Sequence, residues 1–285
     1  MPMSALETAT LRAVAWFMAI GYPPLFEEAF QELRFPEGAP LPAKEDAHAA
    51  FRSLVARGRL VEEDQRFVLP GSEASFAERR ARERVFHRKW RRLRRLAWWL
   101  ALVPSVRFLA VCNTTALGAA RDEADIDLFL VVRRGSLWLT RGLLVAVTSV
   151  FRRRPGQRRG ERDAWCFSFL MDDHDLSLAR FRLEPEDPYL GFWVRNLVPL
   201  LDDGVGRQLW AAQAWAWQDH PFATAWLPWR ALRPRARPFS ERFDRWAQAF
   251  QRRFGPRALW AAAVKGGTDV VLDPHVCKTH LEDRR

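Results

Sequence analysis

The sequence predicts a protein of the α+β or α/β class, in which helices flank a mixed sheet. Three observations support this prediction: short apolar runs of strand length, longer segments with apolar residues at helical spacing, and turn residues between them. A chain of 285 residues is long enough for one large domain or for two to three small ones. We expect a helical module with a hairpin at residues 1–71, the sheet domain with its leading long helix at 72–185, and a Trp-rich helical region at 186–285.

The N-terminal region is expected to contain helices followed by a hairpin. Apolar residues recur at helical spacing, and Gly21 to Pro24 separate the first two helices. This order is typical of a winged-helix module. The third helix mixes both signs of charge and the hairpin turn is acidic, so contact with DNA competes with binding to a protein or packing on the sheet domain. The predicted elements are helices at 11–18, 25–33 and 47–56 and strands at 60–61 and 67–69.

The middle region opens with a long helix that begins after Ser72 as its cap and runs to Leu102, before Pro104. Apolar residues form one stripe along it, while arginines occupy the other faces. A Gly/Arg-rich stretch at 152–162 is predicted to be an exposed loop. The remaining predicted elements are strands at 106–111, 126–132 and 164–171, helices at 137–151, 189–201, 205–217 and 239–254, and a short apolar run at 270–272 that suits a last strand.

Composition limits the function classes only in part. The formal net charge is +11, and only four of the 45 basic residues are lysines. Guanidinium groups match phosphate oxygens in bidentate fashion, but an arginine-rich coding background over the whole surface explains the same composition. Basicity by itself therefore does not select a nucleic acid as the partner.

Cysteine usage and hydropathy indicate the compartment. Cys112, Cys166 and Cys277 are too few and too far apart for a disulfide scaffold or a four-ligand zinc site, which favours a reducing environment. No uncharged apolar run reaches the roughly 20 residues that span a bilayer, and the N-terminus lacks a signal-peptide pattern. We expect a cytoplasmic protein that does not enter a membrane.

Two acidic residues stand two positions apart at the start of a predicted strand. Residues 106–132 read as a strand, a turn of small residues and a second strand, where Asp125 and Asp127 alternate with Ile126 and Leu128. Because side chains alternate across a strand, both carboxylates face one side and the apolar residues face the core. Adjacent carboxylates repel, so a cation is their natural partner. Magnesium, held by one or two carboxylates plus substrate phosphates, fits this pattern.

The run from Asn113 to Arg141, with Asp125-Ile126-Asp127 and Gly135-Ser136-Leu137-Trp138, resembles the nucleotidyltransferases of the DNA polymerase β superfamily. It is similar in particular to a bacterial group of uncharacterised nucleotidyltransferase-domain proteins with an N-terminal extension. Such proteins carry a strand, a Gly-Ser turn, a helical turn and then Asp-x-Asp on the next strand. The resemblance implies a palm fold, a nucleoside triphosphate substrate, Mg²⁺ as cofactor, and Asp125 and Asp127 as catalytic metal ligands.

The resemblance also implies a nucleotide-binding turn. In the superfamily the Gly-Ser turn brings backbone amides and a hydroxyl to the triphosphate, because glycine leaves room for phosphates. Here Asn113 and Thr114 take its place: asparagine tolerates a left-handed conformation, and threonine keeps a hydroxyl. A helix cap after a core strand is the alternative for these two residues. Arg141 is a further nucleotide-binding candidate, with an ion pair as its alternative role.

A third carboxylate, acting as general base for the attacking hydroxyl, is implied in the middle of the next strand. The predicted strand at 164–171 has no acid there. Alternation places Cys166, Ser168 and Leu170 on one face, so the expected position is Ser168 or Cys166. The other face is predicted to carry Trp165, Phe167, Phe169 and Met171, and the acids of this region stand only at the strand ends, at Asp163, Asp172 and Asp173.

The sequence leaves two functions open. The first is an enzyme that transfers a nucleoside monophosphate from a nucleoside triphosphate to an acceptor hydroxyl with Mg²⁺; the acceptors of the superfamily include proteins, nucleic acids and small molecules. The second is a non-catalytic protein that binds nucleotide or a partner, which the missing third acid favours. A separate set of potential metal ligands, for which a C-terminal strand and tail is the alternative, comprises Asp273, His275, Cys277 and His280.

Overall fold

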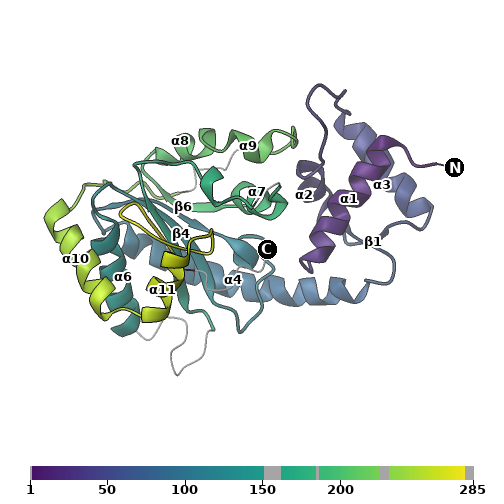
Figure 1. Ribbon diagram of the computed structural model, residues 1–285. Coiled ribbons are helices and arrows are strands. Elements are labelled where there is room, and N and C mark those ends of the chain that lie inside the picture. Colours follow the sequence, from purple (N-terminus) through teal and green to yellow (C-terminus); the bar gives the residue numbers. More distant parts are fainter. Residues whose placement is uncertain (1, 151–161, 184–185, 225–230, 280–285) are drawn as a thin grey trace. The chain divides into compact units, whose positions relative to one another are not determined.

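The structure, a computed structural model, describes residues 2–150, 162–183, 186–224 and 231–279 (Figure 1). The chain forms two compact units. The N-terminal unit comprises Met1–Arg84 together with Trp215–Ala225, and the sheet unit comprises Val85–Ala214 together with Trp226–Arg285. Within the described segments, no helix combines the length and the apolar character needed to cross a bilayer.

The N-terminal unit begins with three helices and a hairpin. Helix α1 begins at a reciprocal capping box, in which Glu7 N donates to Ser4 Oγ at 3.1 Å and Ser4 N donates to Glu7 Oε2 at 2.8 Å. The hairpin turns at Asp64 and Gln65, whose φ values of 50° and 61° suit a two-residue turn. The elements are α1 Ala5–Ala19, α2 Phe26–Gln31, α3 Lys44–Ala56, β1 Val61–Glu63 and β2 Arg66–Val68.

A distant segment of the chain completes the N-terminal unit. Within Trp215–Ala225, Phe222 stacks on Phe30 with 4.3 Å between the ring centroids, and Asp219 pairs with Arg34 at 2.9 Å. The structure therefore divides the chain differently from the expected boundaries at 72 and 186. The reason is packing: aromatic and charged partners on α2 and the loop after it draw this segment away from the rest of the C-terminal region.

The sheet unit is built on a six-stranded sheet with the order β6-β3-β4-β5-β8-β7. Strands β4 and β5 are parallel, and all other neighbours in the sheet are antiparallel. The predicted class, a mixed sheet with flanking helices, is confirmed. The strands are β3 Val106–Val111, β4 Ile126–Val132, β5 Trp165–Asp172, β6 Val198–Asp202, β7 Val270–Leu272 and β8 Val276–Thr279.

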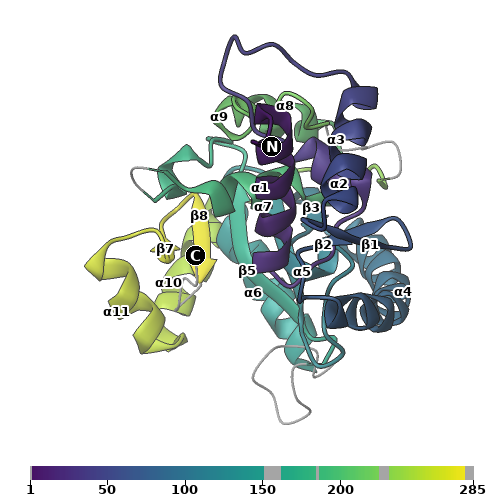
Figure 2. The same ribbon diagram turned by 90° about the vertical axis from the view of Figure 1, so that its right-hand side faces the viewer.

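Helices cover both faces of this sheet (Figure 1). On one face, Ile126 and Leu128 pack into a buried apolar cluster with Leu93 of α4, Leu144 of α6 and Ala247 of α10. The other face carries α7 and α8. Figure 2 shows β8 beside β5, where it extends the sheet. The helices are α4 Ala74–Leu100, α5 Asn113–Ala116, α6 Leu137–Val150, α7 Pro188–Arg195, α8 Val205–Ala211, α9 Ala214–Trp217, α10 Glu241–Phe254 and α11 Arg257–Lys265, with a 3₁₀ turn at Ala179–Phe181.

The helix predicted at 189–201 is wrong in its second half. Helix α7 ends at Arg195, and residues from Val198 form β6, the outer strand next to β3. Pro199 explains the break: it lacks an N–H and clashes inside a helix, but an edge strand tolerates it. The region after 186 thus supplies three strands to the sheet in addition to its helices. The loop predicted at 152–162 falls outside the described residues except for Arg162.

Candidate metal centre

The two aspartates converge at the start of the central strand β4. Asp125 directly precedes the strand and Asp127 lies within it, while Ile126 and Leu128 are fully buried in the cluster on the other face. This is the arrangement that strand alternation predicts. Strand β4 lies between β3 and β5, so both of its edges are hydrogen-bonded and its side chains are held in place. The carboxylates therefore project from a rigid part of the sheet.

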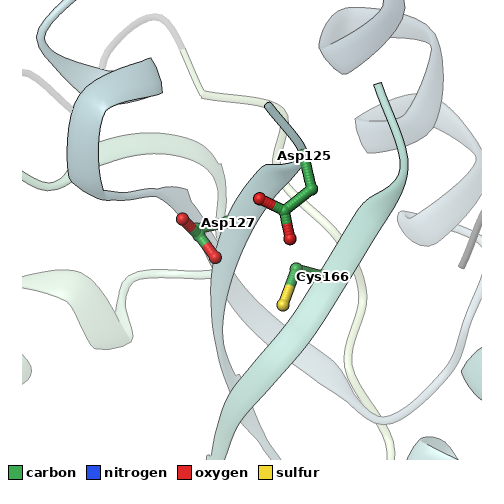
Figure 3. A group of neighbouring side chains, drawn as sticks. All are labelled: Asp125, Asp127 and Cys166. Atoms are coloured by element: carbon green, nitrogen blue, oxygen red, sulfur yellow. The ribbon is translucent and has the colours of Figure 1, made fainter. Parts of the chain in front are cut away.

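Strand β5 brings a third donor to the same point. Cys166 pairs with Asp127 in the parallel register between β4 and β5. One ligand atom from each of Asp125, Asp127 and Cys166 lies within 4.8 Å of the other two, and all three residues are half-buried. Figure 3 shows Asp125 and Cys166 between the two strands, with the Asp127 carboxylate beside β4. In the part of the chain that the structure describes, this is the group of acidic, histidine or cysteine side chains close enough to share one metal ion.

The predicted faces of Phe169 and Leu170 on β5 are wrong. The register shifts between the pairs Asp127–Cys166 and Phe129–Phe169. Between these two pairs β5 contains one residue more than β4, as in a β-bulge. Phe169 consequently contacts Phe129, with ring centroids 5.1 Å apart, on the face that carries Asp127. Leu170 instead joins the cluster with Ile126 on the opposite face. Simple alternation predicted the reverse, because a local pattern contains no signal for the extra residue.

The pairing of β4 with β5 decides between the two expected positions for a third ligand. Cys166 is the residue that pairs with Asp127, and its sulfur belongs to the ligand group. Ser168 lies two residues further on, is buried, and interacts with Cys166. Of the two expected positions, Cys166 is therefore the one that contributes to the ligand group, and it contributes a thiol.

Asn113 adopts the predicted left-handed conformation beside the aspartates. Its φ is 55°, and its side-chain Nδ2 donates to Asp127 Oδ2 at 2.8 Å. The backbone of the preceding residue supports the same corner, because Cys112 N donates to Asp127 O at 3.2 Å. Thr114 is exposed on the short helix α5. The turn and the carboxylate pair are thus connected directly, through an amide that orients one aspartate.

Two cysteine thiols lie next to the negative charges of the aspartates. Burial raises the pKa of Cys166, and the charges of Asp127 and Asp125 raise it further. Burial likewise raises the pKa of Cys112, with smaller contributions from Asp127 and Cys166. Each of these thiols is held in its protonated form because a thiolate would be desolvated next to carboxylates. A bound cation is the change that would favour a thiolate at this point.

Cationic side chains from α4 support the chain just before both strands. Lys89 is fully buried; its Nζ donates to Ala124 O and pairs with Asp163 at 3.0 Å. Arg88 and Arg92 also pair with Asp163. Burial, followed by the charge of Arg88, lowers the pKa of Lys89 to about 8. Since Ala124 precedes Asp125 and Asp163 lies at the entry to β5, these contacts fix the ends of the two strands that carry the ligands.

Lys89 was not identified from the sequence, although one signal was available. It is one of four lysines in a chain that otherwise uses arginine. A compact ammonium suits a buried position with few acceptors better than a guanidinium with five N–H groups does. The apolar stripe of this helix placed Trp90 on the core side and Arg88 on another face, and it did not indicate that Lys89 pairs with Asp163.

Arg141 lies away from the carboxylates. It belongs to α6, which packs on the sheet face opposite Asp127, and it donates a hydrogen bond to Gln251 of α10. Its guanidinium also lies 5.9 Å from the centre of the Trp138 ring. The structure therefore brings Asp125, Asp127 and Asn113 together and places Arg141 elsewhere.

The acids at the ends of β5 are engaged in other contacts. Asp172 Oδ2 lies 2.9 Å from His275 Nδ1, and Asp173 pairs with Arg107 at 2.7 Å. His275 stacks on His174 at 4.3 Å, whereas Cys277 is fully buried in the apolar cluster. The C-terminal set of potential metal ligands is thus spread over β8 and its turn. His280 falls outside the described residues.

The donor set determines which cations suit the centre. Two carboxylates that leave room for phosphate oxygens are compatible with Mg²⁺, which prefers hard oxygen ligands in octahedral geometry. The thiol is a soft ligand that Mg²⁺ does not use, whereas first-row transition metals accept both donor types. The aspartates therefore fit the cofactor implied by the sequence resemblance, and Cys166 does not. Comparison of the chain with protein-family models, curated proteins and solved structures gives no match.

Proposed function

We propose that this protein is a nucleotidyltransferase of the DNA polymerase β type, with its palm in the sheet unit. In this proposal a nucleoside monophosphate passes from a nucleoside triphosphate to an acceptor hydroxyl, and Asp125 and Asp127 hold the Mg²⁺ that accompanies the nucleotide. The observation that carries the proposal is the corner where Asn113, in a left-handed turn after β3, donates to Asp127 on β4. A strand, a helical turn and a second strand with paired aspartates follow each other as in that superfamily.

Each residue of the proposed site has its own role. Asp125 and Asp127 supply negative charge on a rigid strand, and Asn113 orients the carboxylate of Asp127. A bound Mg²⁺ would neutralise charge on the phosphates and orient them. Thr114 is exposed beside the turn, and its hydroxyl is proposed to bind a phosphate group. Arg141 is not part of the proposed nucleotide site, because it donates a hydrogen bond to Gln251 on the sheet face opposite Asp127.

The transfer step needs no oxidant or reductant. The acceptor oxygen bonds to the α-phosphorus, the bond between that phosphorus and the pyrophosphate oxygen breaks, and the hydroxyl proton is lost. In the described part of the chain no third carboxylate stands beside Asp125 and Asp127 to take this proton. Burial raises the pKa of the Cys166 thiol, so the thiol stays protonated when no metal is bound and cannot take this proton either. The proton therefore leaves to solvent, and catalysis rests on positioning and charge neutralisation.

The N-terminal unit is proposed to be a winged-helix-like module. Its three helices and hairpin follow the order of that fold, with β1 and β2 as the wing. The wing carries Glu62, Glu63 and Asp64, and Arg80 pairs with two of these acids. An acidic wing repels a phosphate backbone. We therefore propose a protein partner for this module in preference to a nucleic acid.

Ligand-dependent stability tests the proposal. A ligand that binds only the folded state raises its stability by mass action, so adding Mg²⁺ together with a nucleoside triphosphate is expected to raise the melting temperature of the full chain. Asp127→Asn should remove this rise. Glu123→Gln is the matched control, because it removes one charge at an exposed position near the site and should keep the rise.

An equal rise in the wild type and Asp127→Asn would show that the aspartates do not form the nucleotide site. No rise with any of the four ribonucleoside or deoxyribonucleoside triphosphates would exclude nucleotide binding. A non-catalytic, nucleotide-binding function is the second candidate, and the observation that favours it is the thiol of Cys166 at the position of the third carboxylate. Nucleotide-dependent stabilisation without transfer to any acceptor in a cell extract would support this second function.

A further inference from the structure

We propose that Asp125, Asp127 and Cys166 form a centre for a thiophilic divalent transition-metal ion of the Zn²⁺ and Co²⁺ type, with Cys166 Sγ as a direct ligand. The inference builds on the proposed function in one respect: it uses the same two aspartates as metal ligands. It differs in the ion that the chain itself selects. The centre takes Zn²⁺ or Co²⁺ in preference to Mg²⁺ when no nucleotide is present.

The spacing of the donor atoms supports one shared ion. The three ligand atoms lie within 4.8 Å of one another. Zinc binds carboxylate oxygen and thiolate sulfur at about 2.0–2.3 Å, so the ligands of a tetrahedral ion lie roughly 3.5 Å apart. Asp127 and Cys166 are paired residues of neighbouring strands, so the proposal assigns the closing of the remaining gap to side-chain rotation.

The origin of the three ligands also supports a built site. Asp127 lies in β4 and Asp125 directly precedes that strand, whereas Cys166 comes from β5, just before its bulge. The side chain of Asn113 holds one oxygen of Asp127, as outer-shell groups commonly hold metal-ligating carboxylates. Three protein ligands leave a fourth tetrahedral position for water or a substrate oxygen, as in catalytic zinc sites.

The chemistry of the donors distinguishes between ions. Mg²⁺ requires near-octahedral oxygen ligands, and a sulfur atom in the ligand set leaves it with two protein oxygens. Zn²⁺ and Co²⁺ accept carboxylate and thiolate together, and thiolate coordination adds affinity that Mg²⁺ cannot obtain. A cysteine at this point therefore selects for the transition metal, whereas an aspartate there would select for Mg²⁺.

Cobalt provides the test, because a thiolate bound to Co²⁺ gives a charge-transfer absorption band in the near ultraviolet. The full chain is stripped with a chelator and titrated with Co²⁺. The wild type is expected to develop the band with one ion per chain, and Cys166→Ser should lose it. Cys112→Ser is the matched control, since Cys112 is a buried thiol in the neighbouring turn outside the ligand group and the band should persist. Zn²⁺ should displace Co²⁺, and a large excess of Mg²⁺ should not.

Absence of the band in folded wild type, or its persistence in Cys166→Ser, would overturn the inference. If Cys166→Ser fails to fold, X-ray absorption of the zinc-loaded wild type decides: a sulfur neighbour at about 2.3 Å supports the inference, and oxygen or nitrogen neighbours alone overturn it. Cys166→Asp should invert the preference towards Mg²⁺. The two proposals fail separately, because stabilisation by Mg²⁺ and nucleotide without a cobalt band refutes only the thiolate centre, and a cobalt band without nucleotide-dependent stabilisation refutes only the nucleotidyltransferase.

Discussion

At the scale of single residues, the chemistry of the centre depends on what stands opposite Asp127. The residue there is Cys166, a neutral thiol in a setting that already contains two carboxylates. A third carboxylate at this point would add repulsion in the free protein and a proton acceptor in the reaction. Replacing the thiol therefore separates the two functions that the site supports.

Cys166→Asp is expected to increase nucleotidyl transfer in the presence of Mg²⁺. General-base assistance contributes about a hundredfold, which is visible above a weak background. The assay follows transfer of labelled nucleoside monophosphate from each of the four triphosphates, with cell extract as the source of acceptors. Ser168→Asp is the matched control, because its carboxylate enters two residues further along β5. Nucleotide binding without transfer in the wild type and in both variants would favour the non-catalytic function.

Asn113 combines a backbone role with a side-chain role, and two substitutions separate them. Asn113→Gly keeps a residue that accepts the φ of 55° but removes the donor to Asp127. Metal affinity should fall about 10- to 100-fold, the usual cost of losing an outer-shell partner, with little change in melting temperature. Asn113→Ala should lower metal affinity and stability together. Unchanged Co²⁺ affinity in Asn113→Gly would mean that the amide does not orient Asp127.

At the scale of secondary-structure elements, local signals predict most of the helices and strands, and non-local contacts determine where these elements begin and end. The pairing of β5 with β4 sets Cys166 opposite Asp127, the bulge that follows reverses the faces of Phe169 and Leu170, and Pro199 prevents the segment after α7 from continuing as helix. The start of α1 is the clearest case of local determination. Ser4 and Glu7 satisfy each other's backbone amides within a single turn.

The capping carboxylate of α1 gives a stability prediction with a defined pH dependence. The hydrogen bond from the Ser4 amide, followed by the contacts with Arg57 and Ser53, lowers the pKa of Glu7 from 4.5 to about 2. The native state therefore favours the ionised form. This contribution to stability is fully present above pH 4.5 and is lost as the pH falls through about 2.

Glu7→Gln is accordingly expected to lower the stability of the N-terminal unit at pH 7 and to flatten its decline between pH 4.5 and about 2. Chemical unfolding across this range, followed by amide exchange in α1, measures the effect. Glu45→Gln is the control, because Glu45 is an exposed acid in the first turn of α3. Parallel acid-unfolding profiles for the wild type and Glu7→Gln would contradict the assignment.

At the scale of the whole molecule, the chain is divided into units by packing and not by sequence order. Segment Trp215–Ala225 lies far along the chain but belongs to the N-terminal unit, where Phe222 contacts Phe30 and Phe35. Its flanking residues belong to the sheet unit. Each unit therefore has its own core, and a change in one core should leave the other intact.

Phe222→Ala is expected to destabilise the N-terminal unit by about 2 kcal/mol, because it removes a half-buried aromatic ring from that core. Amide exchange should accelerate in α2, while Co²⁺ binding in the sheet unit stays unchanged. Phe243→Ala is the control: Phe243 is 65% exposed on α10, and its removal should change stability by less than about 0.5 kcal/mol. Faster amide exchange in β4 than in α2 after Phe222→Ala would mean that the segment Trp215–Ala225 does not belong to the N-terminal unit.

The sequence by itself determined what depends on near neighbours along the chain. Alternation placed Asp125 and Asp127 on one face of β4, and the small residues after the first strand predicted a turn, in which Asn113 tolerates a left-handed backbone. Both follow from local geometry, which a period of two or a single φ value expresses completely. The class of the fold and the long helix α4 were accessible for the same reason.

Only the tertiary structure decided what depends on register and on distant partners. It set Cys166, and not Ser168, opposite Asp127 through the pairing of β5 with β4, placed Arg141 on the sheet face opposite Asp127, and brought Lys89 into contact with the residues just before β4 and β5. It also showed that residues from Val198 form strand β6. The physical reason is common to all four: the free energy of each arrangement lies in hydrogen bonds and buried contacts between residues far apart in the chain, which no local pattern encodes.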